Sequence, residues 1–464
     1  MAKFDLRNIT VLAERLGRPH RAYPCAHIAG TNGKGSTAAM LASILQQAGL
    51  KTGLYTSPHL ERINERIRVN GEEVSDADFA ATFTRIHRLI EELLASGDLA
   101  AHPTFFECLT ALAFEYFAKA PHIERRHPES RPRRDEGSTF LDSSRTSNAV
   151  SSPRQPGLGR TTGEGRKRGV DFAVFEVGLG GRLDSTNIVQ PAACIITEID
   201  FDHENFLGHS IEQIAGEKAG IIKPGVPVVC SASRPEARAV IERRAAELRA
   251  PFTHIDEEPL TLELEVPLPG RFQVRNARAA AAAVQILTRR GFVGVTGEGI
   301  QRGIAATRWP GRLEKLSPPP GPGPASGIPT VYLDGTHNPA GARELAAFWD
   351  EQLPGRRIHL VFGAVRDKAV DEIAGLLFPR AECVYLTAPR TGRAISPQAL
   401  AHMTAHHARA HEVFAEPEAA LQRALGAAAP SEVVFATGSL YLVGDLRRWW
   451  RQRAPQPATA KSPS

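Results

Sequence analysis

The sequence has few cysteines and no long apolar run. Its five cysteines are scattered singly along 464 residues and form no CxxC pair, so neither a disulfide framework nor a zinc site is indicated. No apolar run approaches the length of a membrane span, and the first residues lack the apolar core of a signal peptide. We therefore expect a cytoplasmic protein with no membrane partner and with reduced, mostly buried thiols.

An excess of one charge is absent outside a single segment. The chain carries 56 Lys and Arg against 51 Asp and Glu, a formal net charge of +5. Residues 121–168 hold eleven Lys and Arg against six Asp and Glu, also +5, so the remainder is neutral. A nucleic-acid partner is therefore not expected. The same segment is rich in Arg, Ser, Pro and Gly without apolar periodicity, which predicts a disordered, solvated insertion and disfavours a docking site for an anionic partner.

What the chain does contain is an alternation of short apolar runs and helical patterns. Residues 26–30 and 171–177 predict buried strands, and residues 36–49 and 104–118 predict helices. This alternation is typical of α/β domains with a mostly parallel, doubly wound sheet.

The length suggests more than one domain. We expect an N-terminal domain of the P-loop ATPase type over residues 1–306 and a smaller, Rossmann-like α/β domain over residues 307–453. Residues 454–464 are expected to form a disordered tail, and the Pro- and Gly-rich stretch 317–324 is expected to widen a turn.

The strongest motif is Gly30-Thr31-Asn32-Gly33-Lys34-Gly35-Ser36-Thr37, placed between an expected strand and an expected helix. Glycines let backbone N–H groups surround phosphate oxygens, the helix N-terminus adds positive potential, and Lys34 supplies a charge beside the terminal phosphates. One glycine more than in the general phosphate-loop pattern separates Lys34 from Ser36. A plain glycine turn is the alternative, but the strand–turn–helix setting and the lysine favour ATP binding.

This loop resembles the phosphate loop of the Mur ligase superfamily, in its branch of folylpolyglutamate and dihydrofolate synthases. Other stretches resemble the same branch, in the same order: TSPHL at 56–60 with NERI at 64–67, EVGLGGRLDSTN at 176–187, DH at 202–203 with EKAGIIK at 217–223, and LDGTHNP at 333–339. The resemblance implies an ATP- and Mg²⁺-dependent ligase that joins L-glutamate to dihydropteroate or a folate through an acyl phosphate. Since no coiled-coil stripe or apolar patch is visible, we expect a monomer.

Three residues at the ends of expected strands suit a metal ion. Glu176 ends a buried strand, an unusual place for a carboxylate unless a cation meets it. Ser57 and His203 follow other strands, so the three side chains are expected to converge at the carboxyl edge of the sheet. The resemblance implies that Ser57, Glu176 and His203 hold Mg²⁺. For His203 alone, the alternative is a hydrogen-bonded loop histidine.

The remaining assignments rest on the resemblance. It implies that Lys218 is carbamylated and catalytic, although a surface lysine is the default expectation. It places His337 opposite the γ-phosphate, across a cleft between domains. It also implies ATP contacts from Thr31, Asn32, Gly33, Lys34, Gly35, Ser36, Asn276, Arg312 and Asp334, and contacts to the pterin-bearing substrate from Thr104, Phe105, Leu183, Asp184 and Ser185. For Phe105, core packing is the alternative.

Two other functions are weighed against this one. A peptidoglycan-building Mur ligase shares the chemistry, but the 29 residues before Gly30 are too few for its nucleotide-sugar domain. A non-catalytic nucleotide-binding scaffold is disfavoured because Ser57, Glu176, His203 and Lys218 are all present. The chain departs from the family pattern at Phe272, where many relatives carry histidine.

Overall fold

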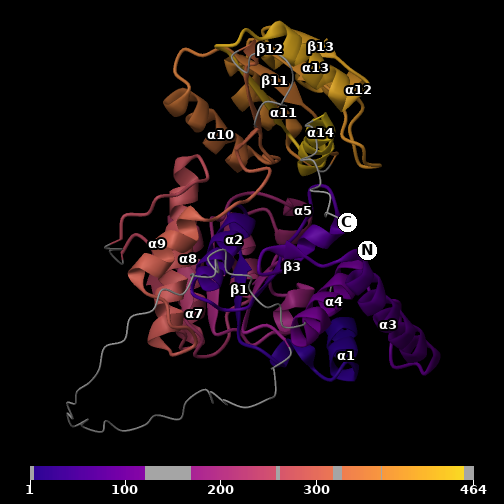
Figure 1. Ribbon diagram of the computed structural model, residues 1–464, viewed down its shortest axis with the longest axis vertical. Coiled ribbons are helices and arrows are strands. Elements are labelled where there is room, and N and C mark those ends of the chain that lie inside the picture. The colour runs from indigo at the N-terminus through magenta and orange to yellow at the C-terminus, as the bar shows by residue number, and fades with distance from the viewer. Residues whose placement is uncertain (1–4, 121–168, 258–261, 317–326, 367, 454–464) are drawn as a thin grey trace, which may run out of the picture.

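A computed structural model describes residues 5–120, 169–257, 262–316, 327–366 and 368–453. The expected insertion at 121–168, the stretch at 317–324 and the tail at 454–464 lie outside these described residues, so their predictions stay untested. Figure 1 shows two α/β domains stacked along the long axis, with the chain passing from the lower to the upper domain after α9.

The N-terminal domain is built on an eight-stranded sheet with the order β4-β3-β2-β5-β1-β6-β7-β8. The β2–β3 and β3–β4 pairs are antiparallel, and the other pairs are parallel. The expected doubly wound sheet is therefore confirmed, with an antiparallel edge added. The strands are β1 Cys25–Ala29, β2 Thr52–Tyr55, β3 Ile67–Val69, β4 Glu72–Glu73, β5 Phe172–Glu176, β6 Ala193–Ile196, β7 Val228–Cys230 and β8 Phe252–His254.

Helices cover both faces of this sheet because successive strand residues point to opposite sides. In β5, Phe172 and Val174 pack with α2, α8 and α9, whereas Ala173 and Phe175 pack with α1, α3 and α4. A third apolar cluster packs α6 and α7 beside the later strands. The helices are α1 Arg7–Arg15, α2 Lys34–Gln47, α3 Asp76–Ala95, α4 Phe105–Lys119, α5 Glu204–Leu207, α6 Ile211–Ala219, α7 Pro235–Glu247, α8 Arg271–Arg289 and α9 Gly297–Ala305.

Helix α2, which begins in the phosphate loop, is held at close range by its neighbours. A Cβ at Gly303 of α9 would lie 2.3 Å from Cα of Ile44, so α9 can approach α2 only with glycine there. On the other side, α8 buries a run of alanines, Ala279–Ala283, in the same cluster. Small side chains on both neighbours therefore fix where α2 lies.

The C-terminal domain contains a six-stranded sheet with the order β13-β12-β11-β14-β10-β9, parallel except for β9 with β10. The strands are β9 Glu314–Leu316, β10 Thr330–Leu333, β11 Ile358–Phe362, β12 Cys383–Leu386, β13 His411–Val413 and β14 Val433–Thr437. The helices are α10 Pro339–Gln352, α11 Val370–Leu377, α12 Pro397–Thr404, α13 Pro417–Ala427 and α14 Leu440–Arg453. Apolar clusters on the two faces pack α10 and α11, and α13 and α14, respectively, which confirms the Rossmann-like architecture.

Candidate active site

The phosphate loop joins β1 to α2 in a conformation that requires glycine twice. Gly30 has φ +148° and Gly33 has φ +88°. A Cβ at Gly30 would lie 1.9 Å from Oγ1 of Thr197, and a Cβ at Gly33 would lie 2.3 Å from Oδ1 of Asn276. The hydroxyl of Thr197 also donates to the carbonyl of Asn32 (2.8 Å). The loop is therefore fixed by contacts from Thr197, directly after β6, and from Asn276 of α8.

Lys34 is the first residue of α2 and turns back over the loop. Its Nζ donates to the carbonyls of Gly30 and Thr31, both at 2.9 Å. Burial lowers the pKa of Lys34, while Glu176 and Asp202 act in the opposite direction. The ammonium is thus held at the opening of the loop, where a phosphate chain would lie on α2.

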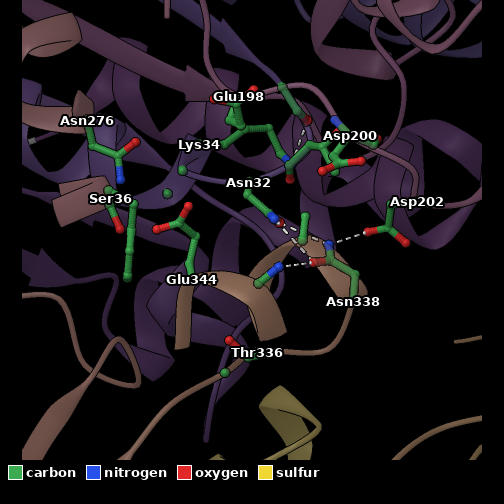
Figure 2. A pocket seen from close by; sticks show the side chains of 18 of the residues that line it. Asn32, Lys34, Ser36, Glu198, Asp200, Asp202, Asn276, Thr336, Asn338 and Glu344 are labelled. Atoms are coloured by element: carbon green, nitrogen blue, oxygen red, sulfur yellow. Dashed lines mark hydrogen bonds between the residues drawn. The ribbon is translucent and has the colours of Figure 1, made fainter. Parts of the chain in front are cut away.

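A cavity of about 740 Å³ opens over this loop, between the two domains. Figure 2 shows its wall, where Asn32 of the phosphate loop is joined by hydrogen bonds to Asn338 of the C-terminal domain. All the residues expected to contact ATP line it, as do Ser57, Glu176, His203, Lys218 and His337. The cavity therefore brings together the expected ATP, metal and catalytic residues.

The three expected metal ligands lie at the carboxyl edge of the sheet. Glu176 is the last residue of β5, and its Oε2 accepts a hydrogen bond from the backbone N–H of Ser57 (3.1 Å). Burial raises the pKa of Glu176, and Lys34 opposes that shift. His203 follows β6 in the left-handed region, with φ +53°. A buried carboxylate, a hydroxyl and an imidazole on one cavity form a donor set that fits a divalent cation.

Lys218 lies on α6, buried directly beneath the phosphate loop. The residue is 4% exposed, and its Nζ donates to the carbonyl of Gly30 (2.8 Å). Burial, reinforced by Lys34, lowers the pKa of Lys218 to about 7. Part of the population therefore carries a neutral amine at neutral pH, which is the form that reacts with CO₂.

The C-terminal domain contributes the loop after β10 to the same cavity. Asp334 accepts the backbone N–H groups of Leu313 (2.8 Å) and Thr336 (3.0 Å). Nδ1 of His337 donates to the carbonyl of Gly335 (2.7 Å). Burial, with Lys368 adding to it, lowers the pKa of His337 to about 4, so this imidazole is neutral at neutral pH.

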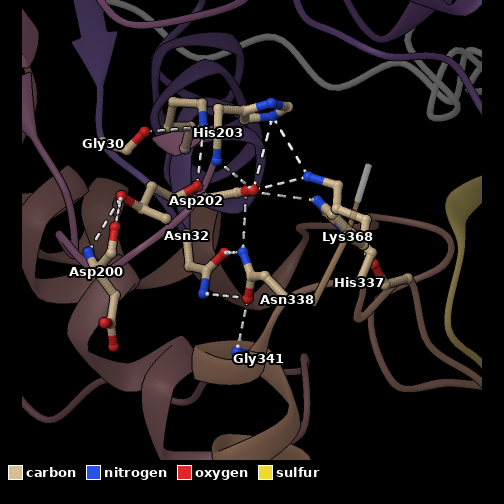
Figure 3. A network of polar contacts seen from close by, with 12 residues as sticks. Gly30, Asn32, Asp200, Asp202, His203, His337, Asn338, Gly341 and Lys368 are labelled. Carbon is tan, nitrogen blue, oxygen red and sulfur yellow. Dashed lines mark hydrogen bonds and ion pairs between the residues drawn. The ribbon is translucent and has the colours of Figure 1, made fainter. Parts of the chain in front are cut away.

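A polar network that sequence analysis did not predict joins the domains at this cavity (Figure 3). Asp202, after β6, accepts from Nζ of Lys368 (2.7 Å) and from Nδ2 of Asn338 (3.1 Å). Nζ of Lys368 also lies 3.4 Å from Nε2 of His203. Burial acts to raise the pKa of Asp202, but Lys368, His203 and His337 together hold it well below its usual range.

A second interdomain ion pair lies beside this network. Asp200 accepts from Arg343 of α10 (2.8 Å) and from Arg234 before α7 (3.0 Å). Asp200, Arg234 and Arg343 also line a second cavity, of about 630 Å³, which shares Asp202 and His203 with the first. The two cavities therefore meet at the residues that connect the domains.

The residues expected near the pterin-bearing substrate do not line the first cavity. Thr104 is the N-cap of α4 and forms a capping box with Glu107. Phe105 is 61% exposed, so the core-packing alternative is wrong, and the guanidinium of Arg66 lies 5.7 Å from its ring centroid. Leu183 is half-buried in the loop before Asp184.

Asp184 and Ser185 are both buried and already have protein partners. The Asp184 carboxylate accepts the backbone N–H groups of Gly178 (2.9 Å), Leu179 (3.0 Å) and Thr186 (3.0 Å). The hydroxyl of Ser185 lies 2.7 Å from that of Thr110 on α4. Asp184 thus shapes the glycine-rich loop after β5, and direct substrate contact by it stays a prediction.

Comparison with known proteins defines the family. The Mur ligase middle domain matches residues 137–257, and the Mur ligase glutamate ligase domain matches residues 312–440. The dihydrofolate synthase/folylpolyglutamate synthase of Bacillus subtilis is 32% identical over 467 residues, covering 96% of this chain and 95% of the relative. The chain belongs to the dihydrofolate and folylpolyglutamate synthase family.

Solved members of this family share the whole fold. The Mycobacterium tuberculosis folylpolyglutamate synthase, complexed with ADP and AMPPCP, aligns with a TM-score of 0.78 at 28% identity, covering 99% of this chain and 96% of that one. The bifunctional Yersinia pestis enzyme, complexed with AMPPNP and Mn ion, aligns with a TM-score of 0.74 at 28% identity, covering 97% and 94%. Membership of this family makes the chain an ATP-dependent amide ligase.

Within the described residues, no helix is long and apolar enough to span a membrane.

Proposed function

We propose that this chain joins L-glutamate to dihydropteroate, to a folate, or to both, with ATP and Mg²⁺. The observation that carries the proposal is the single cavity lined by Lys34, Glu176, His203 and Lys218. A ligase must bring two anions together, the acceptor carboxylate and the γ-phosphate, and this cavity places cationic and metal-binding groups where they would meet.

Two groups of residues would prepare the first step. Lys34 and the N-terminus of α2 would bind the phosphates, while Asn276 and Asp334 would orient the nucleoside. Ser57, Glu176 and His203 would hold Mg²⁺, which when bound screens the charge on the phosphates. The carboxylate of the acceptor then attacks the γ-phosphorus in line, and ADP leaves.

The second step forms the amide bond. The neutral amine of glutamate attacks the carbonyl carbon of the acyl phosphate, inorganic phosphate leaves, and the amine proton passes to solvent or to a nearby base. Water competes with the amine for this carbonyl. The contacts of Asp202 with Lys368 and Asn338 support a closed cleft that limits such hydrolysis.

We further propose that Lys218 carries a carbamate during turnover. A pKa of about 7 provides the neutral amine that carbamylation needs. The modification would turn a buried cation beneath Gly30 into an anion that can support the metal site. We also propose that the enzyme acts in the cytoplasm as a monomer.

The deciding experiment measures glutamate-dependent phosphate release with ATP and Mg²⁺, with dihydropteroate and tetrahydrofolate as separate acceptors. Turnover with both acceptors would identify a bifunctional enzyme, and turnover with one would name the single activity. Lys34→Ala and Glu176→Ala should abolish turnover, whereas Lys315→Ala, which removes an exposed lysine on β9, should preserve it. If folded protein turned over neither acceptor, another amide ligase of the superfamily or a non-catalytic scaffold would be favoured.

A further inference from the structure

We propose that Asp371, His406 and His407 form a binding site for a divalent transition-metal ion such as Zn²⁺. Asp371 lies in the first turn of α11, and both histidines lie in the 3-10 turn Ala405–His407 that follows α12 (Figure 1 locates both helices). One ligand atom of each residue lies within 4.8 Å of the other two. None of the three lines either cavity described above, so the proposal is independent of the ligase reaction.

The distances between the ligand atoms suit a single small ion. Nε2 of His407 hydrogen-bonds to Oδ1 of Asp371 (3.0 Å), a contact that a bound ion would replace, and Nε2 of His406 lies 3.7 Å from the same oxygen. A tetrahedral ion with bonds of about 2.1 Å separates its ligand atoms by about 3.4 Å, and an octahedral one separates adjacent ligand atoms by about 3.0 Å. Small rotamer adjustments would therefore bring all three atoms into coordination.

Packing partly organises the site. The His407 ring lies against α11 at Gly375, where a Cβ would be 3.4 Å from its Cε1 atom. The His407 side chain is consequently only 25% exposed, whereas those of Asp371 and His406 are 66% and 63% exposed. One imidazole is thus held in place, and the open side leaves room for an ion to enter with its water ligands.

The donor set selects the class of ion. The two imidazole nitrogens are borderline ligands that favour Zn²⁺, Co²⁺ or Ni²⁺, and the carboxylate adds a negative charge, whereas Mg²⁺ prefers oxygen ligands and keeps its waters. Protons compete with metal ions for imidazole nitrogens, so the affinity of this site should rise with pH. An ion bound here would connect α11 to the turn after α12 and stabilise the C-terminal domain.

A second group, His87, Glu91 and His102, provides an internal control. Its ligand atoms also lie within 4.8 Å of one another, but all three residues are exposed. Nδ1 of His102 is engaged by the carbonyl of Pro103 (2.8 Å), and Nδ1 of His87 lies 3.8 Å from Glu91. None of these three side chains is as well covered as His407, so this group should bind the same ions more weakly.

The test is a Co²⁺ titration of full-length, untagged protein, followed by visible absorption. Excess Mg²⁺ is included to occupy the metal-binding residues of the phosphate-loop cavity, and nucleotide is left out because its phosphates would themselves bind Co²⁺. Wild-type protein should bind one Co²⁺ ion tightly per chain, and Zn²⁺ should displace it. The double variant His406→Gln/His407→Gln should lose that binding while it keeps ligase turnover, and His87→Gln/His102→Gln should retain it.

A second measurement covers the case in which the double variant does not fold. Asp371→Asn keeps both imidazoles and removes the charged ligand, so its Co²⁺ affinity should fall while its thermal stability without metal is unchanged. Zn²⁺ should raise the melting temperature of wild type and not that of Asp371→Asn. If wild type binds no Co²⁺, or if the His406/His407 and Asp371 variants bind it like wild type, the proposed site is wrong.

Discussion

The side-chain amides of Asn32 and Asn338 exchange hydrogen bonds across the cleft between the two domains. Nδ2 of Asn32 donates to Oδ1 of Asn338 (3.2 Å), and Nδ2 of Asn338 donates to Oδ1 of Asn32 (2.9 Å). Asn32 belongs to the phosphate loop, and Asn338 is the N-cap of α10, where it also accepts from the N–H of Gly341. The pair thus couples the nucleotide loop directly to the position of the second domain.

We expect changes at Asn338 to slow turnover without unfolding the protein. Asn338→Ser keeps a capping oxygen for α10 but loses the contacts with Asn32 and Asp202. Asn338→Asp also keeps the cap, yet it places a second carboxylate beside Asp202, so it should be the more impaired variant. Turnover should fall by about tenfold or more in Asn338→Asp. The free energy of unfolding in urea should change by about 1 kcal/mol in Asn338→Ser and by more in Asn338→Asp, because Asn338 is buried and the new carboxylate has no cationic partner there among the described residues. Equal activity of both variants and wild type would argue against closure through this pair.

Asp202 and Lys368 should form the contact whose loss costs most stability. Their side chains are 11% and 7% exposed, so removing one charge leaves the other buried. Asp202→Asn should destabilise the protein by about 3 kcal/mol in chemical unfolding. The control is Glu416→Gln, which breaks an exposed pair with Arg390 and should cost less than about 1 kcal/mol.

The pH dependence of this contact follows from the depressed pKa of Asp202. Its stabilising contribution is present above the ordinary pKa of an aspartate, about 4, and is lost as the pH falls through the lower value in the folded protein. Stability due to this pair should therefore be flat between pH 5 and 8. A wild-type unfolding free energy that loses the Asp202 contribution within that range would contradict the assignment.

Lys218 should make activity depend on both pH and CO₂. With a pKa of about 7, the neutral amine falls roughly tenfold for each pH unit below that value. Turnover after removal of CO₂ should therefore recover on addition of bicarbonate at pH 8, and much less at pH 6. With ¹³C-bicarbonate, wild type should show a carbamate resonance that Lys218→Arg lacks. Full activity of Lys218→Arg would show that no carbamate is needed.

Asp184→Asn separates a structural role from substrate contact. Both oxygens of the carboxylate accept hydrogen bonds, from N–H and O–H groups of Gly178, Leu179 and Thr186. In the asparagine variant, an NH₂ group replaces one of these oxygens and would meet other donors there. We expect a loss of about 2–3 kcal/mol in stability together with lower turnover. Unchanged stability with a raised KM for the acceptor would instead favour direct substrate binding.

Much of the fold followed from local patterns in the sequence. The apolar run at 171–177 is β5, and the helix expected at 104–118 is α4, with Thr104 as its cap. These elements were predictable because burial on both faces of a sheet and helix capping leave marks within a few residues. The expected convergence of Ser57, Glu176 and His203 needed only the rule that parallel strands end at one edge.

The contacts between domains could not be predicted in this way. Lys368 is 166 residues from Asp202, and nothing in its neighbourhood distinguishes it from a surface lysine. Asp184 was matched to a substrate position, whereas its three backbone partners become visible only when the loop is folded. Pairings set by tertiary packing leave no periodic signal in one sequence.

Because α2 packs closely between α8 and α9, the small residues on these neighbours should tolerate few substitutions. Gly303 and those alanines of α8 that face α2 lie outside the cavity, yet a larger side chain at these positions must push the helix that carries Lys34. In a library of all single substitutions selected for growth, variants at these small residues should therefore be lost as strongly as variants at the catalytic residues of the cavity. The face of α2 that packs on α8 and α9 would therefore be as sensitive to substitution as the residues that line the cavity, although it does not line the cavity itself.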